Sequence, residues 1–239
     1  FICGYEVEKM SKSKFNVVNP DDMISKYGAD VFRMYEMFLG PIEQHKPWDA
    51  SGIDGVSRFV GKFWRLFHNE KIEEADEWIV TNDVATPEEL KVLHTALKKV
   101  NADMEQLSYN TSISALMVAV NELGKLNCHK AEILNPMVQL LAPFAPFIAE
   151  ELWSKLGNEG SVMDTQYPEH DEKHLVENEF EYPVSVNGKV RAKVKLPIDM
   201  GKDEVEKEVL ALEVMKKWIG DDGPRKVIVV PKRIVNVVV

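Results

Sequence analysis

Residues 86–107 read TPEELKVLHTALKKVNADMEQL and decide the main fold, because they predict one long amphipathic helix. Thr86 is the expected N-cap, Pro87 suits the first helical position, and Glu89 completes a capping box. Apolar residues then recur every three or four positions, at Leu90, Leu93, Leu97, Val100, Met104 and Leu107. This spacing is typical of a helix that packs one face against antiparallel neighbours.

The flanking sequence keeps the same period, so we expect a helix bundle over residues 52–157. The first helix of the bundle is expected to carry an apolar stripe over residues 56–67, before the helix at 86–107. The helix that follows residue 107 has an inner face made of Ile113, Leu116, Met117, Val120 and Leu123. A last apolar run, residues 133–156, must bend where two prolines interrupt it, Pro143 and Pro146. These stripes are typical of a core, and we assign them no ligand.

From residue 181 the hydrophobic period changes to that of strands. Asn187-Gly188 between two alternating runs is a strong hairpin signal. A period of two on the return strand separates apolar residues from cations: Val190, Ala192, Val194 and Leu196 against Lys189, Arg191, Lys193 and Lys195. One helix over residues 202–218 and strands at 226–230 and 234–239 complete a small α+β domain of order ββαββ.

The charge of the chain is unevenly distributed. Its net charge of −10 argues against a wholly basic nucleic-acid coat, yet residues 181–239 hold 12 Lys and Arg against 9 Asp and Glu, a local charge of +3. The cationic row on the hairpin favours an anionic partner, with a solvated sheet edge as the alternative. The same two interpretations are open for the polar side of the first bundle helix, which carries Arg58, Lys62 and Arg65.

Residues 8–16 are Glu8-Lys9-Met10-Ser11-Lys12-Ser13-Lys14-Phe15-Asn16, a cationic stretch with hydroxyl side chains between its lysines. Ammonium and hydroxyl donors are the chemistry that holds a polyphosphate while its charge develops. A solvated lysine run on a surface turn is the alternative. Two short helices are expected after this loop, the first with Asn19 as N-cap, Pro20 at its first position and Gly28 at its end.

Composition limits the class of protein further. The chain has 239 residues, of which 45% are hydrophobic, so it can bury a core and form more than one soluble domain. No run of about 18 apolar residues and no signal peptide is present, and Cys3 and Cys128 give neither a zinc nor a disulfide pattern. We therefore expect a reducing, cytoplasmic setting and no metal site. Because a complete motif follows Phe1 almost at once, we also expect a piece of a longer protein.

The string Lys9-Met10-Ser11-Lys12-Ser13 is identical to the signature loop of class I aminoacyl-tRNA synthetases. Further motifs follow in order: Val17–Asp22, Tyr27–Asp30, Gly52–Val56, Ala142–Trp153 and Val186–Arg191. Together they cover essentially the whole chain and resemble leucyl-tRNA synthetases of the bacterial type. Isoleucyl and valyl enzymes share the loop and the Gly52–Val56 motif, so the same region of such an enzyme is an alternative. Phe147 stands where the family often has His, which we interpret as a packing substitution.

The resemblance implies a parent enzyme that joins leucine to ATP, releases pyrophosphate and passes the leucyl group to tRNA(Leu). Lys9 and Lys12 would neutralise phosphate charge, with Lys12 foremost, while Ser11 and Ser13 position the loop around Met10. Mg²⁺ would arrive with ATP. No His-x-Gly-His motif occurs, so the fragment alone is expected to be inactive.

The resemblance also implies a mainly α organisation in parts. Residues 1–51 would end the catalytic domain, 52–157 form an anticodon-binding-type bundle, 158–180 an acidic linker, and 181–239 a tRNA-binding domain. Contacts with tRNA would come from the bundle and from the hairpin, through Arg58, Lys62, Lys189, Arg191, Lys193 and Lys195. We expect a cytoplasmic monomer without membrane contact. A free-standing tRNA-binding module with a vestigial loop is the alternative.

Overall fold

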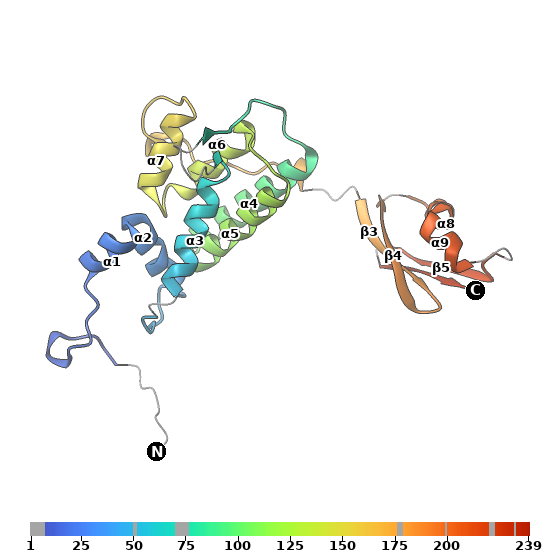
Figure 1. Ribbon diagram of the computed structural model, residues 1–239, viewed down its shortest axis with the longest axis horizontal. Coiled ribbons are helices and arrows are strands. Elements are labelled where there is room, and N and C mark those ends of the chain that lie inside the picture. Colours follow the sequence, from blue (N-terminus) through green and yellow to red (C-terminus); the bar gives the residue numbers. More distant parts are fainter. Residues whose placement is uncertain are drawn as a thin grey trace, which may run out of the picture. The chain divides into compact units, whose positions relative to one another are not determined.

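The computed structural model describes residues 8–49, 52–69, 77–175, 179–198, 200–219, 223–231 and 233–239. The chain divides into two compact units, Phe1–Leu175 and Val176–Val239, and each is described by itself (Figure 1). Cys3 lies outside the described residues, whereas Cys128 is a buried free cysteine.

In its described residues the first unit is helical, apart from one short two-stranded pairing and an isolated bridge between Thr81 and Lys130. Its helices are α1 Pro20–Tyr27, α2 Ala29–Phe38, α3 Gly52–Trp64, α4 Pro87–Glu105, α5 Tyr109–Lys125, α6 Ala131–Leu141 and α7 Pro146–Lys155. The sequence did not predict the strands β1 His68–Asn69 and β2 Glu77–Trp78, which pair antiparallel. These strands are too short for a period of two to be visible in the sequence.

Local signals set the helix ends as expected. The Thr86 Oγ1 accepts a hydrogen bond from Glu89 N at 3.3 Å, and the Glu89 carboxylate accepts one from Thr86 N at 2.6 Å, which is the predicted capping box. Asn19 caps α1 by accepting from Asp21 N at 3.3 Å. Gly28 follows α1 with φ 88°, a value that favours glycine.

The predicted stripes of α4 and α5 form the centre of the first core. Leu93, Leu97 and Val100 are buried with the inner face of α5, Ile113, Leu116, Val120 and Leu123. Leu107 was wrongly expected in this core, since it is 52% exposed. It lies beyond the end of α4, and its φ of 55° reverses the chain before α5.

The network around Glu89 carries a buried charge. Its carboxylate also accepts a hydrogen bond from Lys130 Nζ at 2.8 Å and is almost fully buried. Burial favours the neutral acid, but the hydrogen bonds from Lys130 and Thr86 outweigh it and lower the pKa of Glu89 to about 2. Burial raises the pKa of the neighbouring Cys128 to about 11, so its thiol stays protonated.

Helix α2 packs against the bundle and holds the start of α7. The Asp30 carboxylate accepts hydrogen bonds from Phe147 N at 3.2 Å and Ile148 N at 2.7 Å, and so caps a helix whose own N-cap, Ala145, has no polar side chain. Arg33, an exposed residue of α2, donates to the Pro143 carbonyl at 3.1 Å. Phe147 is 71% exposed, so its interpretation as a packing substitution is wrong.

The segment expected as an acidic linker packs on the bundle over residues 158–175. The Gln139 amide donates to Thr165 Oγ1 at 3.0 Å, and the Asn101 amide donates to the Pro168 carbonyl at 3.0 Å. The division between the two compact units falls after Leu175. The part of the chain before that point is therefore held by hydrogen bonds that composition did not reveal.

The second unit is a four-stranded sheet with helices on one face (Figure 1). Its elements are β3 Glu179–Val186, β4 Lys189–Pro197, α8 Lys202–Ala211, α9 Glu213–Ile219, β5 Lys226–Val230 and β6 Ile234–Val238. The strand order is β4-β3-β6-β5, with β3 and β6 parallel and the other pairs antiparallel. The single helix predicted over 202–218 is wrong, because extended backbone at Leu212 (ψ 129°) divides it.

A β-bulge shifts the hairpin cations from their predicted row. Val184 pairs with Ala192 and Ser185 with Val190, so Arg191 is an extra residue on β4. Residues beyond such a bulge change face relative to a strict period of two. Lys189 consequently lies opposite the buried Val186, and the expectation of four cations on one face is wrong.

Candidate nucleotide and RNA sites

The lysine loop, residues 8–16, holds its shape by hydrogen bonds of its own. Lys12–Lys14 form a 3-10 turn, in which Lys14 N donates to the Ser11 carbonyl at 3.1 Å. The Asn16 side chain bridges two further backbone groups: its Oδ1 accepts from Ser11 N at 2.8 Å, and its Nδ2 donates to the Lys9 carbonyl at 3.4 Å. Two hydroxyls of the loop, Ser11 Oγ and Ser13 Oγ, are 3.2 Å apart and hydrogen-bonded.

The loop lysines differ in their partners. Lys14 Nζ forms an ion pair with Glu8 at 3.0 Å. Within the described part of the chain, no ion pair or hydrogen bond engages the ammonium groups of Lys9 and Lys12, and both residues are exposed. The loop therefore presents two cations and two hydroxyls to an anion, while its third lysine supports the base.

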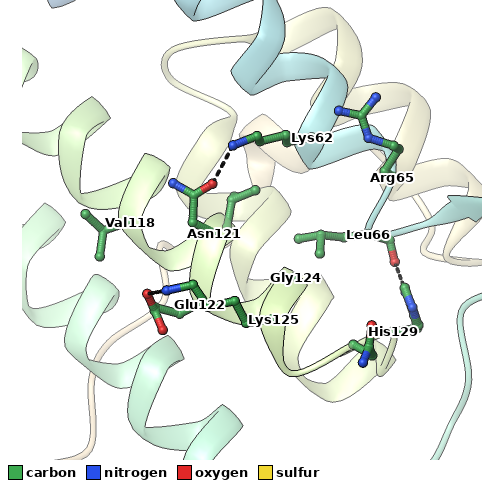
Figure 2. A pocket seen from close by; sticks show the side chains of 11 residues that line it. Lys62, Arg65, Leu66, Val118, Asn121, Glu122, Gly124, Lys125 and His129 are labelled. Atoms are coloured by element: carbon green, nitrogen blue, oxygen red, sulfur yellow. Dashed lines mark hydrogen bonds and ion pairs between the residues drawn. The ribbon is translucent and has the colours of Figure 1, made fainter.

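A second candidate site is the hollow between α3 and α5, with a volume of about 710 Å³ (Figure 2). Its polar lining comes from both helices and from the turn after α5: Lys62, Arg65, Asn121, Glu122, Lys125, Asn127 and His129. Lys62 Nζ donates to Asn121 Oδ1 at 2.8 Å, and Lys125 Nζ pairs with Glu122 at 2.6 Å. We call this surface the α3–α5 groove; it combines cations with amide groups, the donors that contact a phosphate and ribose backbone.

The predicted helix cations divide at this groove. Lys62 lines it, whereas Arg58 lies one turn earlier, outside the lining, where its Nε donates to the Asp54 carbonyl at 3.3 Å. The sequence left Arg65 open between an anionic partner and a solvated helix face, and it did not assign Lys125 or Asn121 to a site. The exposed spacing of Asn121 and Lys125 on one helix face was a usable signal, but only the packing of α5 beside α3 makes it meaningful.

The hairpin cations have distinct surroundings. The Arg191 guanidinium stacks over the Trp218 ring of α9, 3.9 Å from its centroid, which places it on the helix-covered side of the sheet. Lys193 Nζ pairs with Glu181 at 2.9 Å, and Lys193 and Lys195 lie opposite Pro183 and Glu181 in the strand register. The positive charge is thus distributed over both sides of the hairpin.

Two other kinds of site are not found among the described residues. Within the described ranges, no group of three or more His, Cys, Asp or Glu side chains is arranged to hold a metal ion. None of the helices described is both long and apolar enough to cross a bilayer.

Comparison with known proteins identifies the family. Residues 88–207 match the model of the anticodon-binding domain of tRNA ligase, and residues 1–48 match that of tRNA synthetases class I (I, L, M and V). The chain is 58% identical over 238 residues to a leucine–tRNA ligase of Cytophaga hutchinsonii and 56% identical over 239 residues to that of Bacteroides thetaiotaomicron. Each alignment covers 100% of this chain and 25% of the relative.

A solved structure agrees with these relatives. The crystal structure of the ternary complex of Agrobacterium radiobacter K84 agnB2 LeuRS-tRNA-LeuAMS has a TM-score of 0.65 and 30% sequence identity, over 96% of this chain and 31% of that chain. The fold and the lysine loop are those of a class I aminoacyl-tRNA synthetase. Within that class, the chain belongs to the leucyl-tRNA synthetase family, and it spans about a quarter of the length of the curated relatives it matches. The leucyl interpretation is confirmed over the isoleucyl and valyl alternative.

Proposed function

We propose that this chain is the C-terminal part of an enzyme that activates leucine with ATP and transfers it to tRNA(Leu). The observation that carries this proposal is the lysine loop, which presents Lys9 and Lys12 to solvent on a hydrogen-bonded frame, in a chain whose relatives are leucine–tRNA ligases. The rest of the adenylate site would come from the remainder of the parent enzyme. The chain alone is therefore expected to be inactive, in a cytoplasmic, monomeric parent.

The chemistry asks the loop to stabilise a leaving group. When the leucine carboxylate attacks the α-phosphorus of the magnesium complex of ATP, the bond to the β-phosphate oxygen breaks and pyrophosphate departs with added negative charge. Lys12, assisted by Lys9, would neutralise that charge, and Ser11 and Ser13 would donate hydrogen bonds to the same oxygens. Met10 joins the two lysines within the motif.

Contacts with tRNA are proposed for two surfaces. Lys62 in the α3–α5 groove, with Arg58 one turn away, would meet the tRNA body. The edge strand β4 would meet it from both of its sides, through Lys189 and Arg191 on one and Lys193 and Lys195 on the other. Both surfaces supply cations, to which the groove adds amide groups, and this suits backbone contact that is sensitive to salt and poor in sequence information. The organisation into residues 1–51, 52–157, 158–180 and 181–239 is proposed on the resemblance, with residues 158–175 packed on the bundle.

Replacing Lys12 by Ala in the full-length enzyme tests the phosphate role. Leucine-dependent exchange of pyrophosphate into ATP should fall by roughly a hundredfold or more, the scale of losing one preorganised charge-stabilising donor. Lys14→Ala is the matched control, because that lysine is paired with Glu8 and should lose far less activity. Exchange at the wild-type rate in the Lys12 variant would refute the role.

The groove is tested by changing Lys62 and Arg65 together to Ala and measuring tRNA affinity at several salt concentrations. For every phosphate that the variant no longer neutralises, the slope of log affinity against log salt should become shallower by about 0.7 to 0.9. Lys155→Ala, on α7 outside the groove lining, is the control for simple charge loss. An unchanged slope would show that the groove cations are solvated and do not contact tRNA phosphates.

A further inference from the structure

We propose that Asn16 is a positioning residue, whose side chain fixes the backbone around Lys12 so that Lys9 and Lys12 reach one polyphosphate together. This inference rests on the function proposed for the lysine loop. Asn16 does not contact the phosphate in this proposal. It acts through the backbone of Ser11 and Lys9.

The geometry uses both halves of the amide. The Asn16 carbonyl oxygen accepts from Ser11 N at 2.8 Å, and its NH₂ group donates to the Lys9 carbonyl at 3.4 Å. Asparagine offers an acceptor and donors at once, whereas aspartate offers only acceptors and alanine neither. The shorter contact, to Ser11, is the one that we expect to matter most.

Ser11 is held from both of its backbone polar groups. Its N–H is bound by Asn16, and its carbonyl accepts from Lys14 N at 3.1 Å. Lys12 is the next residue, so its Cα position follows from this fixed peptide. A donor that is already in place when charge develops costs no reorganisation during the reaction.

Burial does not supply this order. The 3-10 turn Lys12–Lys14 has no buried residue, and Phe15, the largest apolar side chain of the loop, is 96% exposed. Phe15 also has φ 52°, a left-handed value that is unfavourable for a bulky residue. Polar contacts of Asn16, together with the Glu8–Lys14 ion pair, therefore hold the loop within the described residues.

Pyrophosphate exchange by full-length variants tests the positioning. Asn16→Ala should lower kcat by roughly tenfold or more while the KM for leucine stays unchanged, because the loop is mispositioned and the amino-acid site is not. Asn16→Asp keeps the acceptor toward Ser11 and should recover most of that loss. Asn19→Ala is the matched control: it removes the same side chain three residues away, where the amide caps α1 through Asp21 N, and should leave kcat near wild type.

Hydrogen exchange of the Ser11 amide gives a readout independent of activity. Asn16→Ala should speed it by about fivefold, the factor that corresponds to one hydrogen bond of ~1 kcal/mol, and Asn16→Asp should not. Wild-type kcat in Asn16→Ala, with Lys12→Ala impaired, would overturn the positioning role alone. Wild-type pyrophosphate exchange in Lys12→Ala would instead overturn the proposed function. An unchanged rate of hydrogen exchange at the Ser11 amide in Asn16→Ala would show that Asn16 does not hold the loop.

Discussion

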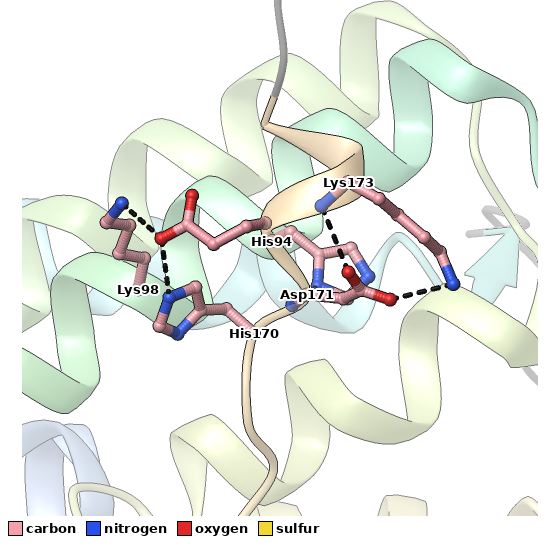
Figure 3. Close-up of polar contacts among 6 residues, drawn as sticks. His94, Lys98, His170, Asp171 and Lys173 are labelled. Atoms are coloured by element: carbon pink, nitrogen blue, oxygen red, sulfur yellow. Dashed lines mark hydrogen bonds and ion pairs between the residues drawn. The ribbon is translucent and has the colours of Figure 1, made fainter.

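Lowering the pH from about 8 to about 5 should loosen the segment 168–174 from α4, because a neutral histidine ring holds it there. Asp171 N donates to His94 Nδ1 at 2.9 Å, so this nitrogen carries no proton and the ring is neutral (Figure 3). The ring also stacks on His174, with centroids 4.4 Å apart at an interplanar angle of 18°. A proton on Nδ1 would face the Asp171 N–H directly and break the hydrogen bond.

The direction of the effect follows from the surroundings of His94. Burial lowers the pKa of His94, His174 lowers it further, Asp171 opposes this, and His170 and Lys173 add to the lowering. The pKa of His94 in the folded state lies below the unfolded value of about 6.5. The stabilisation that His94 gives to the docked segment is therefore complete above that value and is lost as the pH falls through the folded pKa.

Neighbouring carboxylates do not titrate in the same range. Contacts with Lys173 lower the pKa of Asp171, and contacts with Lys98, at 2.6 Å, and His170 lower that of Glu172. Both carboxylates therefore stay ionised over the whole pH range of this experiment. The Glu172 carboxylate also lies 3.2 Å from His170 Nε2.

The expected magnitude is that of one hydrogen bond, ~1 kcal/mol, which raises the population of the open segment about fivefold. Exchange of the Asp171 amide, corrected for its intrinsic pH dependence, measures this opening. His94→Asn keeps an acceptor near the Nδ1 position without a titrating ring and should remove the pH dependence, while His94→Phe should leave the amide open at every pH. A His94→Asn protein with the wild-type pH profile would show that another group is responsible.

Two further substitutions test the hydrogen bonds of Glu89 and of Asp30 in the first unit. Glu89→Gln should lower the free energy of unfolding by about 2 kcal/mol, measured by urea denaturation, because it leaves the Lys130 ammonium without its charged partner. The stabilisation from Glu89 should be present above its unfolded pKa of about 4.3 and be lost as the pH falls toward 2, and a flat acid profile would contradict the assignment. Asp30→Ala should lower the free energy of unfolding by about 1 kcal/mol in the same assay, because it uncaps α7. Asp30→Asn keeps an acceptor and should keep most of the wild-type stability. Equal losses in both variants would show that the charge of Asp30, and not its role as a cap, is responsible.

Short-range signals explain what the sequence predicted well. The ends of α1 and α4 are set by Asn19 and Thr86, which act on backbone groups two or three residues away. The Asn187-Gly188 turn has φ 47° and 81°, as its sequence requires, and the lysine loop is contiguous, so its residues could be named together. In each case the partners lie within a few residues of one another.

Features that depend on distant segments were not predictable in the same way. The Asp30 cap on α7 joins residues 117 and 118 positions apart, and the α3–α5 groove exists only because two helices pack side by side. The bulge at Arg191 adds one residue to β4 without any proline or glycine to mark it, so a strict alternation placed the hairpin cations wrongly. The amphipathic period of a helix shows which of its faces is buried, but it does not show which neighbouring helix packs against that face.

The net charge of −10 is compatible with the proposed contacts to a polyanion, because exposed charges act over about 8 to 10 Å in physiological salt. Several acidic residues occupy first turns of helices, where the helix dipole favours them, such as Asp21 and Asp22 in α1 and Glu88 in α4. These residues do not line the α3–α5 groove, where the one acidic residue among the described lining residues, Glu122, is paired with Lys125. The field that an RNA backbone would meet there is therefore set by Lys62 and its neighbours, and the charge of the whole chain is a poor guide to it.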